Sequence, residues 1–155
     1  MHTRRTLLSR SATLAALLAG TGLWPALTQA QGAGYNTAAF DAKSVADLLK
    51  VLGAAAPVES RDVTVTGPDI AENGAVVPIG VSTTLPGVKR MLLLVEKNPA
   101  VLSAAFDMSD AVEANFLTRV KMGQSSNVFA VAMMNDGKVL FAQKEVKVTL
   151  GGCGG

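Results

Sequence analysis

The residue with the clearest chemistry of its own is Cys153, because it is the only cysteine among 155 residues. It lies in the sequence Gly151-Gly152-Cys153-Gly154-Gly155, with two glycines on either side. Glycine gives the backbone more conformational freedom than any other residue, and it offers no side chain against which a thiol could pack. The spacing predicts a thiol on a flexible C-terminal arm, with a reach of about 10 Å from Gly151 to Cys153 for an extended chain.

Nothing in the surrounding sequence activates this thiol. A thiol reacts as its thiolate, which a nearby cation, a helix N-terminus or a metal ion stabilises. The nearest basic residue, Lys147, is six residues away, and the carboxylate of Gly155 would oppose ionisation. We therefore interpret Cys153 as a covalent attachment point: a group is attached there, and the arm carries it into the active sites of separate enzymes.

The composition excludes the common catalytic sites. The only histidine, His2, lies within the first thirty residues. Without a second histidine or cysteine, the rest of the chain has no Ser-His-Asp triad, no Cys-His pair and no histidine or multi-cysteine metal site. We expect no catalytic constellation, no metal and no cofactor. A single cysteine also excludes an internal disulfide and favours either intermolecular pairing or a reactive thiol.

The first thirty residues predict a signal peptide that is removed after Ala30. Arg4-Arg5 precedes an apolar run, residues 12–23, and a stretch of small residues follows. The run is shorter than the roughly 20 residues of a membrane span, so an anchor is the less favoured interpretation. The paired arginines resemble a twin-arginine signal, which predicts export of a folded protein to the periplasm. Residues 31–36 are expected to form a disordered leader.

The net charge of the chain adds little to these expectations. Of the 14 basic residues, three arginines lie in the signal, so the remaining chain is nearly balanced against 12 acidic residues. This balance predicts no nucleic-acid surface, and no membrane association is expected after cleavage.

The arm must be positioned by residues 37–150. Helical spacing predicts one amphipathic helix over residues 38–52, which begins near Asn36 or Thr37 and ends at Gly53. We expect this helix to cover one edge or face of the domain with its apolar residues, which are Phe40, Val45, Leu48, Leu49 and Leu52.

Short strands separated by turn signals follow the helix. Asn73-Gly74 and Asp136-Gly137 predict hairpins, and Pro86-Gly87 predicts a turn. The most apolar segment, residues 91–95, predicts a central strand, and Pro78 predicts a bulge or an edge. Seven strands are expected, over residues 63–66, 75–85, 88–96, 101–106, 113–122, 128–134 and 139–150. The pattern predicts an all-β fold, an immunoglobulin-like antiparallel sandwich without its usual disulfide.

Four segments together give the chain a family resemblance. They are Pro68-Asp69-Ile70-Ala71-Glu72-Asn73-Gly74 followed by Val76-Val77-Pro78, Thr118-Arg119-Val120-Lys121-Met122, Glu145-Val146-Lys147-Val148-Thr149, and the Gly-Gly-Cys-Gly-Gly sequence. With them, the chain resembles the SoxY family, the covalent sulfur-substrate carriers of periplasmic thiosulfate-oxidising Sox systems.

The resemblance implies a set of partners. It implies a heterodimer with SoxZ and oxidative joining of thiosulfate to Cys153 by the c-type cytochrome SoxAX. It also implies release of sulfate by the dimanganese hydrolase SoxB and oxidation of the remaining sulfane sulfur by SoxCD where that enzyme is present. The intermediates stay on Cys153, and Gly151, Gly152, Gly154 and Gly155 form a swinging arm.

Alternatives remain open at this point. The chain could be a structural or adhesion-type sandwich that dimerises through a Cys153 disulfide, or a thiol enzyme in its own right. Asn73-Gly74 is most simply a tight turn. Arg119 and Lys121 are most simply solvent-facing or interface residues of a strand, and a role near a bound anion is the alternative for them.

Overall fold

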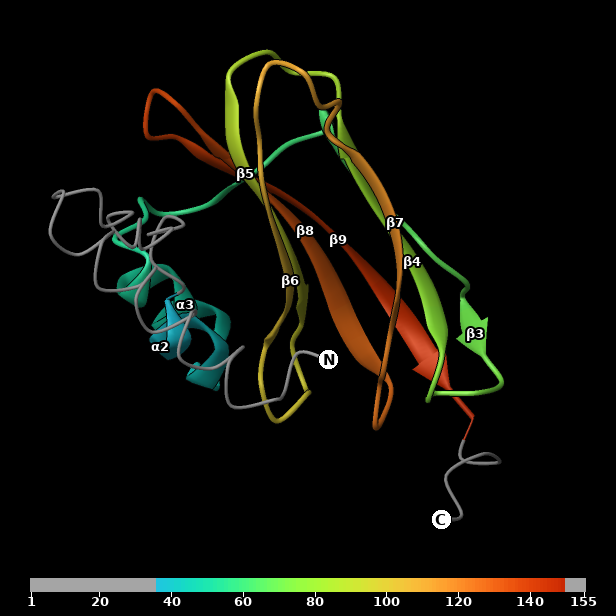
Figure 1. Cartoon of the computed structure of the whole chain (residues 1–155). Helices are drawn as coiled ribbons and strands as arrows, with labels where there is room; N and C mark the ends of the chain where they lie inside the picture. The colour runs from blue at the N-terminus through green and yellow to red at the C-terminus, as the bar shows by residue number, and fades with distance from the viewer. Residues whose placement is uncertain (1–35, 150–155) are drawn as a thin grey trace, which may run out of the picture. The chain divides into compact units, whose positions relative to one another are not determined.

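In this computed structural model, residues 36–149 are described; the predicted signal peptide and the glycine-cysteine arm lie outside them (Figure 1). Within this range there are two short helices, α2 (Thr37–Asp41) and α3 (Val45–Val51). Neither is long and apolar enough to cross a membrane. The strands of the described range are β1 (Val58–Glu59), β2 (Val63–Thr66), β3 (Ile70–Ala71), β4 (Val77–Thr83), β5 (Val88–Val95), β6 (Leu102–Asp107), β7 (Asn115–Val120), β8 (Ser126–Met134) and β9 (Val139–Val148).

The strands form the two sheets of a β-sandwich. The larger sheet has the order β1-β9-β8-β5-β6, with β3 also paired to β9, and the smaller sheet has the order β2-β4-β7. All pairs are antiparallel except those of β1 and β3, which run parallel to β9. The predicted all-β sandwich and its seven strands are confirmed. The two-residue strands β1 and β3 were not predicted.

The larger sheet is buried on both faces, and β5 shows why its sequence is so apolar. Met91, Leu93 and Val95 belong to the core between the sheets. Leu92 and Leu94 belong to a second core under the helices. Successive residues of a strand point to opposite faces, so a strand covered on both sides needs apolar residues at every position. The prediction that residues 91–95 form a central strand is confirmed.

The predicted single helix is wrong: the chain forms two helices with a break after Asp41. Ser44 has an extended backbone, and its Oγ accepts the Asp47 N–H at 3.1 Å, which caps a new helix. The carbonyl of Ala42, at the break, accepts the N–H of Val101 at 3.2 Å. A tertiary hydrogen bond therefore takes the place of a helical one. The predicted end at Gly53 is confirmed, with a left-handed φ of 61°.

The turns are only partly as expected. Gly137 (φ 88°) joins β8 to β9 in the predicted hairpin, and Gly87 (φ 74°) lies in the turn before β5. Asn73-Gly74 does form a turn, in which the Val76 N–H bonds to the Asn73 carbonyl at 3.3 Å. It does not form a hairpin, because the strand before it, β3, pairs with β9 and not with β4.

The expectation that Pro78 lies at a bulge or edge has a simple explanation in the sheet. Strand β2 reaches only as far as Gly80 along β4, so Pro78 pairs on one side alone, with Arg119 of β7. Proline, which has no N–H to donate, is tolerated in sheets at such positions, where a partner strand lies on one side only.

Replacing Leu48 by alanine should destabilise the domain, because its side chain is fully buried against the larger sheet. We expect the free energy of unfolding to fall by about 2–5 kcal/mol, measured by urea denaturation. Val51→Ala is the matched control on the same helix, because Val51 is 41% exposed. Equal effects of the two substitutions would contradict the packing of α3 on the sheet.

Candidate functional site

The predicted attachment residue Cys153 and its four glycines lie outside the described residues, so the site is approached from the segment that precedes it. Strand β9 ends at Val148, and Thr149 is the last described residue. Cys153 follows four residues later, a reach of at most about 14 Å for an extended chain. The part of the sandwich around Thr149 therefore decides where a group on Cys153 can go. We call the end of β9 with Thr149, together with the residues that hold them in place, the arm base.

Hydrogen bonds from two sides hold the end of β9. The last pair between β8 and β9 joins Ser126 to Val146. Beyond it, β3 and the residue before it accept two backbone N–H groups, that of Lys147 at the Asp69 carbonyl (2.9 Å) and that of Thr149 at the Ala71 carbonyl (3.1 Å).

The N–H group of Val148, which lies between those of Lys147 and Thr149, points away from β3. The Val148 N–H donates to the hydroxyl of Ser125 at 2.9 Å. All three consecutive N–H groups from Lys147 to Thr149 are thus satisfied, which fixes the backbone as far as Thr149.

Gly74 lies close to both Met122 and Val148. Its carbonyl accepts the Met122 N–H at 2.7 Å. A Cβ atom at this position would overlap the Met122 carbonyl oxygen and would lie 2.8 Å from Cγ1 of Val148. Position 74 requires glycine because of this close approach. A left-handed backbone is not the reason, because the φ of Gly74 is not positive.

Three of the segments that carry the family resemblance meet here. Residues 68–74 supply β3 and Gly74, residues 118–122 end at Met122, and residues 145–149 form the end of β9. Figure 1 shows β3 beside the end of β9, although the two are far apart in the sequence. Sequence reasoning gave these segments no shared location, and it missed Ser125 altogether. In the sequence, only the family resemblance linked these three segments to one another.

One ion pair lies at the arm base. Lys144 of β9 contacts the carboxylate of Asp69, whose side chain is 89% exposed. The side-chain hydrogen bond from Lys144, together with its charge, lowers the pKa of Asp69 below the usual value. The backbone carbonyl of Asp69 also bonds to β9, so both parts of this residue hold β3 in place.

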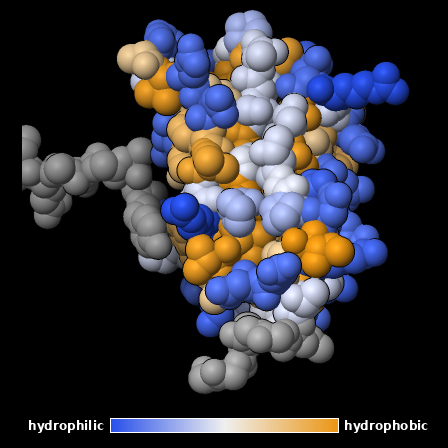
Figure 2. Space-filling view, turned by 90° about the vertical axis from the view of Figure 1, so that its right-hand side faces the viewer, coloured by the Kyte–Doolittle hydropathy of each residue, from blue (hydrophilic) through white to orange (hydrophobic). Residues whose placement is uncertain are grey.

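The basic residues Arg119 and Lys121 are exposed, as predicted, and neither side chain forms an ion pair with a described residue. Arg119 lines a hollow of about 410 Å³ with Pro78, Leu117 and Thr118 on the outer face of the smaller sheet. Leu117 is 79% exposed there. Figure 2 shows apolar patches among hydrophilic side chains on this side of the molecule. A role of either cation near a bound anion stays a prediction.

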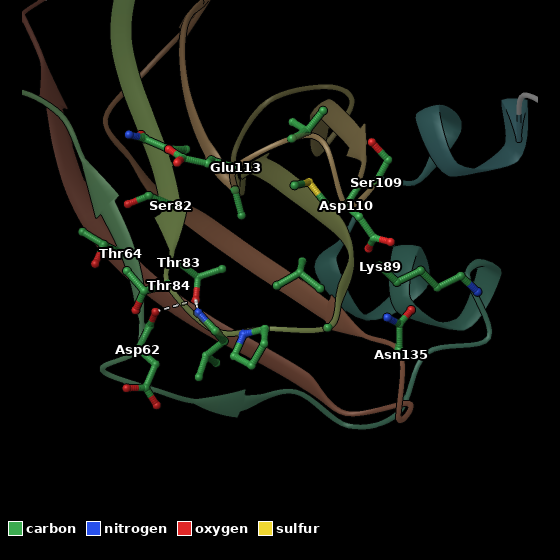
Figure 3. A pocket seen from close by; sticks show the side chains of 18 of the residues that line it. Asp62, Thr64, Ser82, Thr83, Thr84, Lys89, Ser109, Asp110, Glu113 and Asn135 are labelled. Atoms are coloured by element: carbon green, nitrogen blue, oxygen red, sulfur yellow. Dashed lines mark hydrogen bonds between the residues drawn. The ribbon is translucent and has the colours of Figure 1, made fainter.

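A larger hollow of about 900 Å³ lies at the other end of the sandwich (Figure 3). The first residues of β5 and the turn at Asn135 border it, whereas the arm base lies beside the opposite ends of β5 and β8. Its rim is polar, with Asp62, Asp110 and Glu113 among the lining residues. Within residues 36–149, no three histidine, cysteine or acidic side chains are grouped as metal ligands, and no buried polar side-chain atom lacks a partner.

Comparisons with known proteins agree with the architecture. A family model described as sulfur oxidation protein SoxY matches residues 48–153. The solved structure of the sulfur carrier protein SoxY from Chlorobium limicola f thiosulfatophilum is 31% identical, with a TM-score of 0.60 over 66% of this chain and 93% of that chain. A superoxide reductase (neelaredoxin) from Ignicoccus hospitalis, 16% identical, has a TM-score of 0.52 over 57% of this chain and 81% of its own, a likeness of fold alone. No curated protein sequence matches.

Gly74→Ala should disturb the arm base, because its new methyl group meets the Met122 carbonyl and the Val148 side chain. We expect a loss of about 1–3 kcal/mol in the free energy of unfolding, with shifted amide signals at Val148 and Thr149 in NMR spectra. Gly123→Ala is the control, since a Cβ there meets nothing within 4 Å. A Gly74→Ala variant with unchanged stability and unshifted signals would contradict this packing.

The Asp69–Lys144 pair should make the arm base sensitive to acid. The pKa of Asp69 is lowered in the folded chain, so its stabilising effect is present above the unfolded pKa, near 3.9, and is lost as the pH falls through the folded value. Hydrogen exchange at Lys147 and Thr149, corrected for the intrinsic pH dependence, should accelerate below pH ~4. Asp69→Asn should abolish this acid-induced change; an identical acid response in that variant would show that another group is responsible.

Proposed function

Because this chain belongs to the SoxY family of sulfur oxidation proteins, we propose that it carries sulfur intermediates bound covalently to Cys153. The observation that carries the proposal is the extent of the family match, which runs from residue 48 through the sandwich to residue 153, the cysteine itself. The arm base, in which three consecutive backbone N–H groups are hydrogen-bonded, supports the same role.

Loading is proposed as an oxidation. The thiol of Cys153 and thiosulfate together lose one proton and two electrons, and a bond forms between Sγ and the sulfane sulfur. The product is a cysteine S-thiosulfonate, and the electrons pass to a c-type cytochrome, SoxAX. No group of the chain itself needs to accept them, so the carrier acts as a substrate of this step.

Unloading is proposed as a hydrolysis. Water attacks the sulfonate sulfur under the action of SoxB, the bond between that sulfur and the sulfane sulfur breaks, and sulfate and two protons leave. A persulfide remains on Cys153 for oxidation by SoxCD where that enzyme is present. The residues after the predicted signal include no histidine, which supports a carrier without catalysis or a cofactor of its own.

The location and the permanent partner are part of the same proposal. We propose that the twin-arginine signal directs the folded chain to the periplasm, in a heterodimer with SoxZ. A signal for folded export suits a protein that must leave the cytoplasm together with a partner.

The test is the mass of the C-terminal peptide after residues 31–155 are incubated with SoxZ, SoxAX and thiosulfate. We expect a shift equal to one attached thiosulfate group, located on Cys153, that is removed by reductant and absent from Cys153→Ser. Recovery of the chain only as a Cys153 disulfide dimer without a thiosulfonate would instead favour the adhesion-type alternative.

A further inference from the structure

The arm base is held by a pairing of only two residues between β3 and the end of β9, and we infer that β3 is a releasable clasp that sets the length of the arm. Strand β3 has two residues, Ile70 and Ala71. When it is paired with β9, the arm begins after Thr149. When it is released and the Val148 N–H also leaves the Ser125 hydroxyl, the arm begins after Val146, the last residue of β9 that pairs with β8. The inference rests on the proposed function, because it concerns the reach of Cys153.

Few contacts hold the clasp closed. Ile70 is 58% exposed, so Ala71 is the only residue of β3 with a buried side chain. The hydroxyl of Thr149 adds only long contacts, of 3.3 and 3.5 Å, to the carbonyls of Glu72 and Ala71. The Asp69–Lys144 pair is solvent-exposed on the Asp69 side, and such pairs stabilise a structure only weakly. Segments with few buried contacts open locally before the whole domain unfolds.

The part of β9 up to Val146 is held more firmly than the residues that β3 contacts. Val146 is fully buried in the core between the sheets, and β8 pairs with β9 from Met133–Val139 to Ser126–Val146. Opening can therefore stop at Val146. The side chain of Val148 packs at the margin of the same core, so release exposes some apolar surface, and the closed clasp remains the ground state.

Release changes the reach of the attached group by a definite amount. Cys153 is four positions after Thr149 and seven positions after Val146. Extended, these lengths correspond to about 14 Å and about 24 Å. One carrier could then serve shallow enzyme sites with the clasp closed and deeper ones with the clasp open, without a longer permanent arm.

Hydrogen exchange on the whole chain tests whether the clasp opens. The N–H groups of Lys147, Val148 and Thr149 should exchange about tenfold or more faster than the β9 amides paired with β8, because local opening needs less free energy than unfolding. Ser125→Ala, which removes the acceptor of the Val148 N–H, should accelerate all three. Equal protection of the end and the middle of β9 would overturn the inference.

Arm length tests whether opening matters for loading. Deleting Gly151 shortens the arm by one residue, and we expect SoxAX to load thiosulfate about tenfold or more slowly, since misplacement by an ångström or more is costly. Adding Ser125→Ala to this deletion should restore much of the rate, because the weakened clasp supplies the missing length. A purely structural role for Ser125 would instead slow the double variant further, and that result would overturn the inference.

Ser60→Ala is the matched control in the same deletion background. Ser60 is half-buried like Ser125, and its hydroxyl also accepts a backbone N–H, that of Asp62 at 3.1 Å, away from the arm base. It should restore nothing, and an equal recovery with Ser60→Ala would overturn the inference.

A small reagent checks that the thiol itself is unchanged. All variants should react equally fast with tetrathionate, from which the Cys153 thiolate displaces thiosulfate to form the S-thiosulfonate, because this reaction needs no reach. A Ser125→Ala effect as large with tetrathionate as with SoxAX would overturn the inference. If the unaltered chain gains no adduct from SoxAX, the proposed function fails, and the exchange experiment alone decides on the clasp.

Discussion

Three hydrogen bonds that backbone N–H groups donate at the end of β9, two to carbonyls and one to the Ser125 hydroxyl, are the constraint on which the candidate site depends. They fix Lys147, Val148 and Thr149, and the sequence beyond Leu150 is glycine on both sides of one cysteine. Glycine imposes no preferred direction on a chain, and the described hydrogen bonds fix the path of the chain as far as Thr149. For a short tether, the volume that the tethered group can explore is small and its effective concentration near a docked partner is high. For the proposed carrier, a well-fixed arm base would therefore help to define where Cys153 can reach.

The architecture of the two sheets explains how the short arm base at the end of β9 is held firmly. Strand β9 is the longest strand in the described part of the chain, and its partner β8 lies between it and β5. The sheet they form is packed on one face by the smaller sheet and on the other by α2 and α3. The base itself joins segments near residues 70, 122 and 148, so it forms only once both sheets are assembled. An arm base built from such distant contacts exists only in the folded chain, which is the state that a twin-arginine route would export.

Local patterns in the sequence were sufficient for most of the scaffold. Alternation and turn residues predicted seven strands, and the continuous apolar run at residues 91–95 correctly indicated a strand buried on both faces. What failed depended on distant partners. The helix break follows from the use of the Ala42 carbonyl by Val101, which no helical periodicity reveals. Strand β3 is too short to have a pattern, and its parallel pairing with β9 made the hairpin interpretation of Asn73-Gly74 wrong. The candidate site was predicted only as a tether, because the groups that hold its base come from segments that are not adjacent in sequence.

The absence of reactive groups near the arm base has a physical consequence of its own. A thiosulfonate or persulfide is open to attack by thiolates and other nucleophiles, and the described residues include no cysteine or histidine that could attack it. For the proposed covalent cargo, the described part of the carrier therefore supplies neither of these two nucleophiles, and selectivity would come from the depth and chemistry of each partner's site. Depth is then the variable that the carrier can match. A longer permanent arm would reach every site but would dilute the thiol over a larger volume. A short arm with the proposed clasp would keep the thiol concentrated in the closed form, and docking to a deeper site would stabilise the released form.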